Sequence, residues 1–203
     1  MKLITTTFTF CDKRILLCLL LLNSFYVIGQ NIFGTEQIID HQTNNVKFVH
    51  IADLNNDNNV DILAASYDIN EITWYQNDGN GNLGVKQVIS TLANKATSVH
   101  AADLNNDGNI DVLSSSVMDN KIAWYQNDGN GNFSDEQIIS TNAMSASSVY
   151  TADLDNDDDI DVISASADDN KIAWYENDGN GNFSIEQIIS TNALGANFVY
   201  IAD

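Results

Sequence analysis

Three stretches of nine residues carry the side chains with the clearest capacity for chemistry. They are residues 53–61, 103–111 and 153–161, and each has an oxygen-bearing side chain at its first, third, fifth and ninth positions. Hard cations such as Ca²⁺ take about six to eight oxygen ligands, which a curled loop can supply from alternate side chains and one backbone carbonyl. An apolar run follows each stretch. The pattern predicts three calcium loops, with the carbonyl coming from the seventh position.

The remaining loop positions separate this motif from its alternatives. The sixth position must turn sharply, which suits Gly108, is tolerated by Asn58 and is less favourable for Asp158. An EF-hand loop needs a glutamate at its twelfth position. The residues found there are Ala64, Ser114 and Ser164. A single copy could equally be an ion-free turn rich in Asn and Asp, but three copies in one register favour calcium.

Composition restricts the partners. The 203-residue chain has a formal net charge of −20, so it lacks the basic footprint of a nucleic-acid-binding protein and is repelled by an anionic membrane surface. Its hydrophobic content of 44% is too high for a disordered acidic tail. We therefore expect one soluble domain that attracts cations and binds no nucleic acid.

Residues 1–29 resemble an export signal. Lys2, Lys13 and Arg14 precede a short apolar run at residues 15–22, and Gly29 supplies a small residue before a mature start at Gln30. An uncleaved anchor is the alternative, although the run is short for a membrane span. Both cysteines, at positions 11 and 18, lie in this segment, so the exported chain contains no disulfide. We expect a secreted or cell-surface protein with no membrane span in the mature chain.

The chain repeats with a period of 50 residues, as Asp53, Asp103 and Asp153 illustrate. Within each repeat, apolar and polar residues alternate in four short runs, and an Asn-Asp-Gly turn separates the last two. Four antiparallel strands in about fifty residues are typical of one blade of a β-propeller. We predict an all-β protein with blades at residues 45–94, 95–144 and 145–194.

The segments flanking these blades predict an incomplete propeller. Residues 31–44 align with the outermost strand of a blade and would close a ring, whereas residues 195–203 would begin a further blade. Three blades alone would leave exposed edges. The expectation is that the propeller of residues 30–203 continues in a longer protein.

These motifs resemble those of a known family. The acidic loop, the following apolar strand, a strand containing Trp124 and the Asn-Asp-Gly-x-Gly-x-Phe hairpin are similar to FG-GAP/VCBS repeats, which also build the N-terminal propeller of integrin α chains. The resemblance covers about residues 31–203 and implies a propeller of seven blades with calcium between the first two strands of a blade. Since the chain contains no proline, the Gly-Ala-Pro element is missing, and the exported bacterial VCBS type is the closer likeness.

The resemblance also implies a ligand set for each calcium loop. The side-chain ligands would be Asp53, Asn55, Asp57 and Asp61; Asp103, Asn105, Asp107 and Asp111; and Asp153, Asp155, Asp157 and Asp161. The backbone carbonyls of Asn59, Asn109 and Asp159 would complete the three sites.

Other residues offer little catalytic chemistry. Trp124 and its copies could stack on sugars, but their fixed place in each repeat favours packing between blades. His50 and His100 align with Tyr150 and Tyr200, which argues against a catalytic base. The sequence therefore predicts a calcium-binding propeller that acts as a binding or adhesion module for an extracellular protein or carbohydrate. The alternative is a scaffold or accessory domain of a secreted polysaccharide-active enzyme whose catalytic part lies elsewhere.

Overall fold

The computed structural model describes residues 36–41 and 43–202, so the predicted export signal, residues 1–29, and the predicted mature start lie outside the described residues. The chain divides into the compact units Met1–Ile38 and Ile39–Asp203, and the features below belong to the second. The described residues form twelve β-strands and no helix. A helix with the length and apolarity to cross a bilayer is accordingly not found in this part of the chain.

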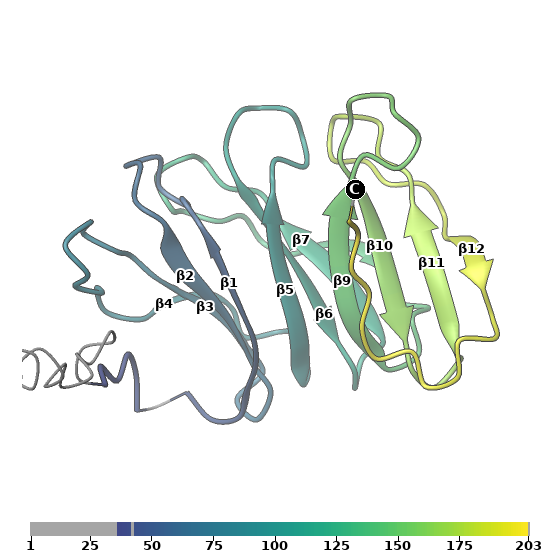
Figure 1. The fold of residues 1–203 in the computed structure, drawn as a ribbon, viewed down its shortest axis with the longest axis horizontal. Helices are drawn as coiled ribbons and strands as arrows, with labels where there is room; N and C mark the ends of the chain where they lie inside the picture. The colour runs from purple at the N-terminus through teal and green to yellow at the C-terminus, as the bar shows by residue number, and fades with distance from the viewer. Residues whose placement is uncertain (1–35, 42, 203) are drawn as a thin grey trace, which may run out of the picture. The chain divides into compact units, whose positions relative to one another are not determined.

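The strands form three four-stranded antiparallel sheets, each ordered as in the sequence (Figure 1). The first sheet contains β1 (Val46–Ala52), β2 (Asp61–Ser66), β3 (Glu71–Tyr75) and β4 (Gln87–Ser90). The second contains β5 (Ala96–Ala102), β6 (Asp111–Ser116), β7 (Lys121–Tyr125) and β8 (Gln137–Ser140). The third contains β9 (Ala146–Ala152), β10 (Asp161–Ser166), β11 (Lys171–Tyr175) and β12 (Gln187–Ser190). The predicted all-β fold of propeller-type blades is confirmed.

The strand register repeats from sheet to sheet. Leu113 of β6 lies opposite His100 of β5 and Trp124 of β7, and the equivalent residues pair in the same way in the other two sheets. All six residues of β6 are buried, and three of them are serines. Small side chains suit this strand because neighbouring blades cover both of its faces. The sequence repeat is therefore also a repeat of backbone hydrogen bonding.

The hydrophobic core lies between consecutive blades. One cluster joins Leu63, Ile72 and Trp74 of the first sheet to Val99, Val112 and Tyr125 of the second. The equivalent cluster joins Leu113, Ile122 and Trp124 to Val149, Val162 and Tyr175. Fully burying one such side chain stabilises a fold by about 1.5–3 kcal/mol. Each blade thus depends on its neighbour for a core.

The tryptophans are part of this inter-blade packing. Trp74 and Trp124 are each only 3% exposed. Phe133 of the second blade meets Trp74 edge to face with ring centroids 6.4 Å apart, and Phe183 meets Trp124 in the same way. The interpretation of these two tryptophans as packing residues is confirmed, because buried rings offer no face to a sugar.

Two predicted strands are not formed. Residues 36–41 and 43–44, the described part of the predicted closing strand at 31–44, have no strand, and neither do residues 196–202 of the predicted further blade. The second segment lies beside β9, since Val199 N–H donates to Ser148 Oγ at 3.3 Å and Tyr200 contacts the ring of Tyr150. A strand needs a backbone ladder, and no described strand pairs with the backbone of either segment.

Candidate metal centres

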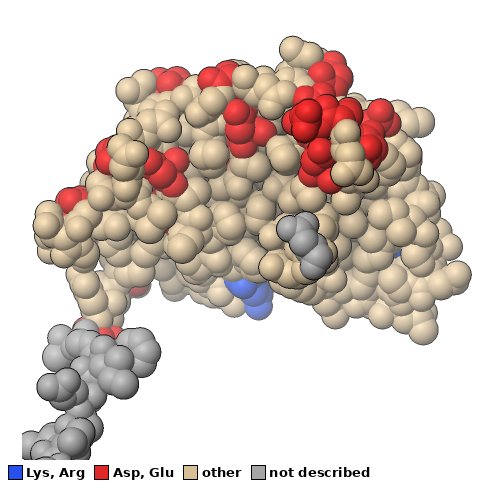
Figure 2. Space-filling view, turned by 45° about the horizontal axis from the view of Figure 1, so that its top comes forward, with Lys and Arg blue, Asp and Glu red and all other residues tan. Residues whose placement is uncertain are grey.

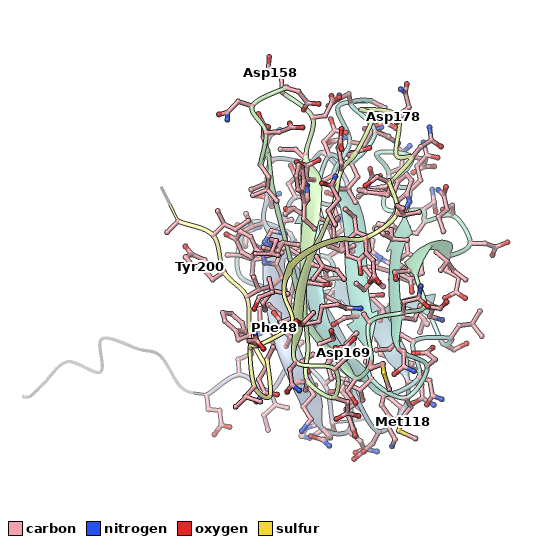
Figure 3. The ribbon with its side chains drawn as sticks, turned by 90° about the vertical axis from the view of Figure 1, so that its right-hand side faces the viewer. Phe48, Met118, Asp158, Asp169, Asp178 and Tyr200 are labelled. Atoms are coloured by element: carbon pink, nitrogen blue, oxygen red, sulfur yellow. The ribbon has the colours of Figure 1, made fainter. Side chains whose placement is uncertain are left out.

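The three acidic loops lie at the same end of the blades. Each connects the innermost strand of a sheet to the second strand, β1 to β2, β5 to β6 and β9 to β10. Acidic side chains gather along this end in the space-filling view (Figure 2). Asp158 of the third loop and Asp178 of the neighbouring hairpin share it, whereas Met118 and Asp169 lie at the opposite end (Figure 3). The fold therefore places all three candidate sites on one surface.

The first carboxylate of each loop organises the backbone. In the first loop, the N–H groups of Asp57 and Asn58 donate to Asp53 Oδ1 and Oδ2 at 3.1 and 2.8 Å. The N–H of Asn59 donates to Asp57 Oδ1 at 2.8 Å. The other two loops repeat this arrangement. These bonds curl the backbone of each loop around its first carboxylate.

The turn residues were only partly predicted. The sixth position has a positive φ in each loop, 66° at Asn58, 84° at Gly108 and 73° at Asp158, as expected. The fourth position, always asparagine, also has a positive φ, between 56° and 63°. The signal for this second turn was present in the sequence, since asparagine tolerates the left-handed region better than most residues.

The ninth position holds a buried carboxylate. Asp61, Asp111 and Asp161 are 0% exposed. Asp111 Oδ2 accepts a hydrogen bond from Leu104 N–H at 3.1 Å, and Oδ1 accepts one from Asn127 N–H at 2.8 Å. The same bonds recur in the other two blades. This aspartate therefore joins the acidic loop to the hairpin that follows the third strand, a role that the sequence did not reveal.

Burial makes this carboxylate costly to ionise without a cation. Desolvation, supported by repulsion from Asp107 and Asp103, raises the pKa of Asp111 to about 6 against the opposing effect of its backbone hydrogen bonds. Desolvation also raises the pKa values of Asp61 and Asp161. A divalent ion beside these groups would favour their charged forms.

The third loop brings three acidic groups together. Oxygen atoms of Asp153, Asp155 and Asp161 all lie within 4.8 Å of one another. Desolvation and then repulsion by Asp157 and Asp161 raise the pKa of Asp155. Carboxylates at such distances suit a hard cation, so the residues of this loop fit the calcium that the sequence pattern implies. They would hold the ion, which would neutralise their mutual repulsion.

The first two loops have an amide at the third position. Asn55 Nδ2 donates to Asp57 Oδ2 at 3.0 Å, and its Oδ1 accepts from Asp57 N–H at 3.2 Å. Asn105 Oδ1 likewise accepts from Asp107 N–H at 3.0 Å. Both loops thus keep an oxygen acceptor at this position but lack the negative charge that Asp155 carries in the third loop.

The seventh position also links adjacent loops. Asn109 Oδ1 accepts from Asn56 Nδ2 of the preceding loop at 2.9 Å, and Asp159 Oδ1 accepts from Asn106 Nδ2 at 2.6 Å. The predicted carbonyl ligands of Asn59, Asn109 and Asp159 stay a prediction. Sequence reasoning missed these inter-loop bonds because their partners are 53 residues apart.

A buried asparagine reinforces the connection. Asn127 Nδ2 donates at 2.8 Å both to Ile110 O of its own blade and to Leu54 O of the preceding loop. Asn177 repeats this with Ile160 and Leu104. In the sequence, the only mark of these two asparagines is that each directly precedes an Asp-Gly turn. The three loops therefore form one connected surface.

The Asp-Gly hairpins use their own acids structurally. Asp128 Oδ1 accepts from Asn130 N–H at 2.8 Å and Oδ2 accepts from Asn132 Nδ2 at 2.9 Å. These bonds, the one from the Asn132 side chain first, lower the pKa of Asp128. Glu136 forms an ion pair of 2.8 Å with Lys121. The carboxylates of Asp128 and Glu136 therefore already have partners within the fold.

Comparison with known proteins identifies the family. The profile of the FG-GAP-like repeat matches the chain at residues 53–114, 110–164 and 155–203. The chain belongs to the FG-GAP-like repeat family. Each match begins within an acidic loop and includes the strands that follow it. A search of curated proteins gave no match.

A solved structure supports the fold of this FG-GAP-like repeat protein. A lectin from Agrocybe aegerita, described as recognising non-reducing terminal N-acetylglucosamine, is 21% identical with a TM-score of 0.52. The match covers 72% of this chain and 39% of the lectin. The Tc holotoxin pore of Photorhabdus luminescens is 18% identical with a TM-score of 0.43, over 70% of this chain and 7% of that one. The chain thus spans well under two thirds of either protein.

Proposed function

We propose that this FG-GAP-like repeat protein is an exported or cell-surface module that binds calcium in its three acidic loops and binds an extracellular protein or carbohydrate. The observation that carries the metal part is the convergence of Asp153, Asp155 and Asp161 in the third loop. The repetition of the loop's hydrogen bonds in all three blades supports extending it to the other two. The export signal predicted at residues 1–29 supports an extracellular setting, where calcium is abundant.

The role of the ion follows from electrostatics. Two carboxylates about 4 Å apart repel by roughly 4 kcal/mol at an effective dielectric constant near 20. Calcium reverses this repulsion and holds the first and second strands of each blade at a fixed separation. Because adjacent loops are hydrogen-bonded to each other, the ion in one loop also restrains the next. Calcium then stabilises the surface as a whole.

The binding role rests on the repeat family and on the fold. Repeated blades present an extended surface of loops on a rigid scaffold, which suits recognition. The structural likeness to a carbohydrate-recognising lectin supports a carbohydrate as one class of ligand. The alternative of an accessory domain in a polysaccharide-active enzyme stays a prediction, and screening the protein for polysaccharide turnover tests it.

Calcium titration by calorimetry tests the proposal. We expect three ions per chain at extracellular affinities of about 10⁻⁴–10⁻³ M, with no equivalent uptake of sodium. Asp53→Asn, Asp103→Asn and Asp153→Asn should each weaken one site. Asp135→Asn is the matched control, because Asp135 is exposed and outside the loops. Absence of calcium uptake would refute the metal role, whereas uptake without binding to any immobilised glycan or extracellular protein would refute the adhesion role.

A further inference from the structure

A second candidate site lies at the opposite end of the blades. A cavity of about 440 Å³ opens among the first residues of the innermost strands and the turns after the second strands. Its lining includes Lys47, Phe48, Tyr67, Asn197 and Phe198. The acidic loops follow the last residues of those same innermost strands, so the cavity and the loops are on opposite ends. Its volume lies in the range typical of small-molecule sites.

The chemistry of this cavity differs from copy to copy of the repeat. The first lining position of the innermost strand is lysine, threonine or serine at Lys47, Thr97 and Ser147, and the matching position of residues 196–202 is Asn197. The lining position after the second strand is Tyr67, Val117 or Ala167. By contrast, the buried tyrosines at 75, 125 and 175 are the same in every copy. The fold therefore does not dictate the residues of the cavity, which together form one asymmetric site.

Two lysines lie beside this cavity. Three of the five lysines among the described residues pair with a glutamate of their own blade at 2.8 or 2.9 Å: Lys86, Lys121 and Lys171. The other two, Lys47 and Lys95, place Nζ 5.0 and 4.9 Å from the centroid of the Tyr67 ring. Lys95 also contacts Asp68 at 3.4 Å, but within the described part of the chain Lys47 has no carboxylate partner.

Aromatic and polar groups complete the lining. The rings of Phe48 and Phe198 stack with centroids 6.2 Å apart, and Phe198 is 61% exposed. On the third blade, Ser145 Oγ donates to Asp168 Oδ2 at 2.6 Å, and the second oxygen of this carboxylate can accept from a ligand hydroxyl. Aromatic faces beside hydroxyl, amide and carboxylate groups are what a pyranose ring requires, since one sugar face is apolar and its rim is polar.

We infer that this cavity binds an acidic saccharide, with the sugar carboxylate on the Lys47 ammonium and the sugar face against Phe198. This inference rests on the proposed binding function and names its ligand class. A single carboxylate suits the site, because a chain of net charge −20 repels polyanions while Lys47 supplies a local charge-assisted hydrogen bond. Asn197 and Asp168 would then form hydrogen bonds with the hydroxyl groups of the sugar.

Calorimetry with matched saccharides tests the inference. The probes are sialyllactose and cellobiouronic acid, each compared with its neutral counterpart, lactose or cellobiose, in millimolar calcium. We expect the acidic member of at least one pair to bind about tenfold more tightly, which is the effect of one charge-assisted contact. Lys47→Gln should abolish that preference, and Phe198→Ala should weaken both members of the pair. Lys86→Gln is the control, because Lys86 also carries a charge but does not line the cavity.

Each other outcome overturns the inference. Equal affinity for acidic and neutral saccharides, or an unchanged preference in Lys47→Gln, would remove the role of the lysine. Equal competition by inorganic phosphate would show an adventitious anion site only. Absence of saccharide binding throughout the millimolar range would refute the site itself. Calcium titration of the same sample distinguishes failure of this inference from failure of the proposed function. Three-site calcium uptake without saccharide binding would refute the saccharide site alone. Thermal melting of each variant shows that it is folded.

Discussion

Replacing Gly131 by alanine tests the packing of one blade on the next. Gly131 lies in the hairpin of the second blade with φ +78°, and a Cβ there would lie 2.5 and 2.7 Å from Cζ2 and Cη2 of Trp74. Trp74 cannot move aside easily, because it is buried and contacts Phe133. Alanine at positive φ costs about 1–2 kcal/mol, and overpacking of a core costs about 1–3 kcal/mol more. We expect Gly131→Ala to lower the free energy of unfolding by roughly 2–5 kcal/mol.

The repeat supplies an internal control. Gly81 holds the equivalent position of the first blade with φ +84°, but nothing lies within 4 Å of an added Cβ. Gly81→Ala should therefore cost only the backbone part, about 1–2 kcal/mol. Urea denaturation at saturating calcium measures both variants, and equal m-values would show that the comparison is valid. Equal losses of stability in the two variants would refute the inter-blade contact as the reason for the glycine.

Three further predictions concern buried polar groups. Burial, with a smaller contribution from the neighbouring His50, lowers the pKa of His100 to about 4 from 6.5, so its stabilisation is complete above pH 6.5 and is lost as the pH falls towards 4. His100→Tyr should reduce this pH dependence of the urea midpoint, and an identical profile would contradict the assignment. Lys121→Glu should destabilise the fold by about 3–5 kcal/mol, and adding Glu136→Lys should restore part of that, because the first blade already pairs Glu71 with Lys86. If chemical denaturation shows no recovery in the double variant, the swapped pairs are not equivalent. Asp111→Asn should cost about 1–3 kcal/mol in thermal or urea unfolding even without calcium, because an amide accepts through only one atom where two backbone N–H groups donate. An effect seen only with calcium present would assign Asp111 to the metal site alone.

The reversed ion pair of the first blade shows why some contacts of the fold could not be predicted from the sequence. Lys86 at the position of Glu136 looks like an irregularity in the repeat, yet Glu71 replaces Lys121 and the pair is kept at 2.9 Å. Only the register of the third and fourth strands shows that these positions are neighbours. Lys121 Nζ additionally donates to Leu92 O of the preceding blade at 2.8 Å, a contact that Glu71 cannot make. The reversal is therefore a conservative exchange within a blade but not between blades.

The sequence by itself determined the local features of this protein. Alternation of apolar and polar residues set the strands, the 50-residue period set the blades, and the spacing of Asp103, Asp107 and Asp111 set a loop whose internal hydrogen bonds span at most seven residues. Such interactions can be read from a sequence because their partners are close along the chain.

Only the tertiary structure decided how the blades pack on one another and which residues lie between them. Asn127 bonds to Leu54 across 73 residues, and Gly131 packs against Trp74 across 57 residues. The cavity brings Lys47 of the first blade together with Phe198, which follows the third blade. No local pattern encodes these pairs, because they depend on the angle and distance at which one blade packs on the next.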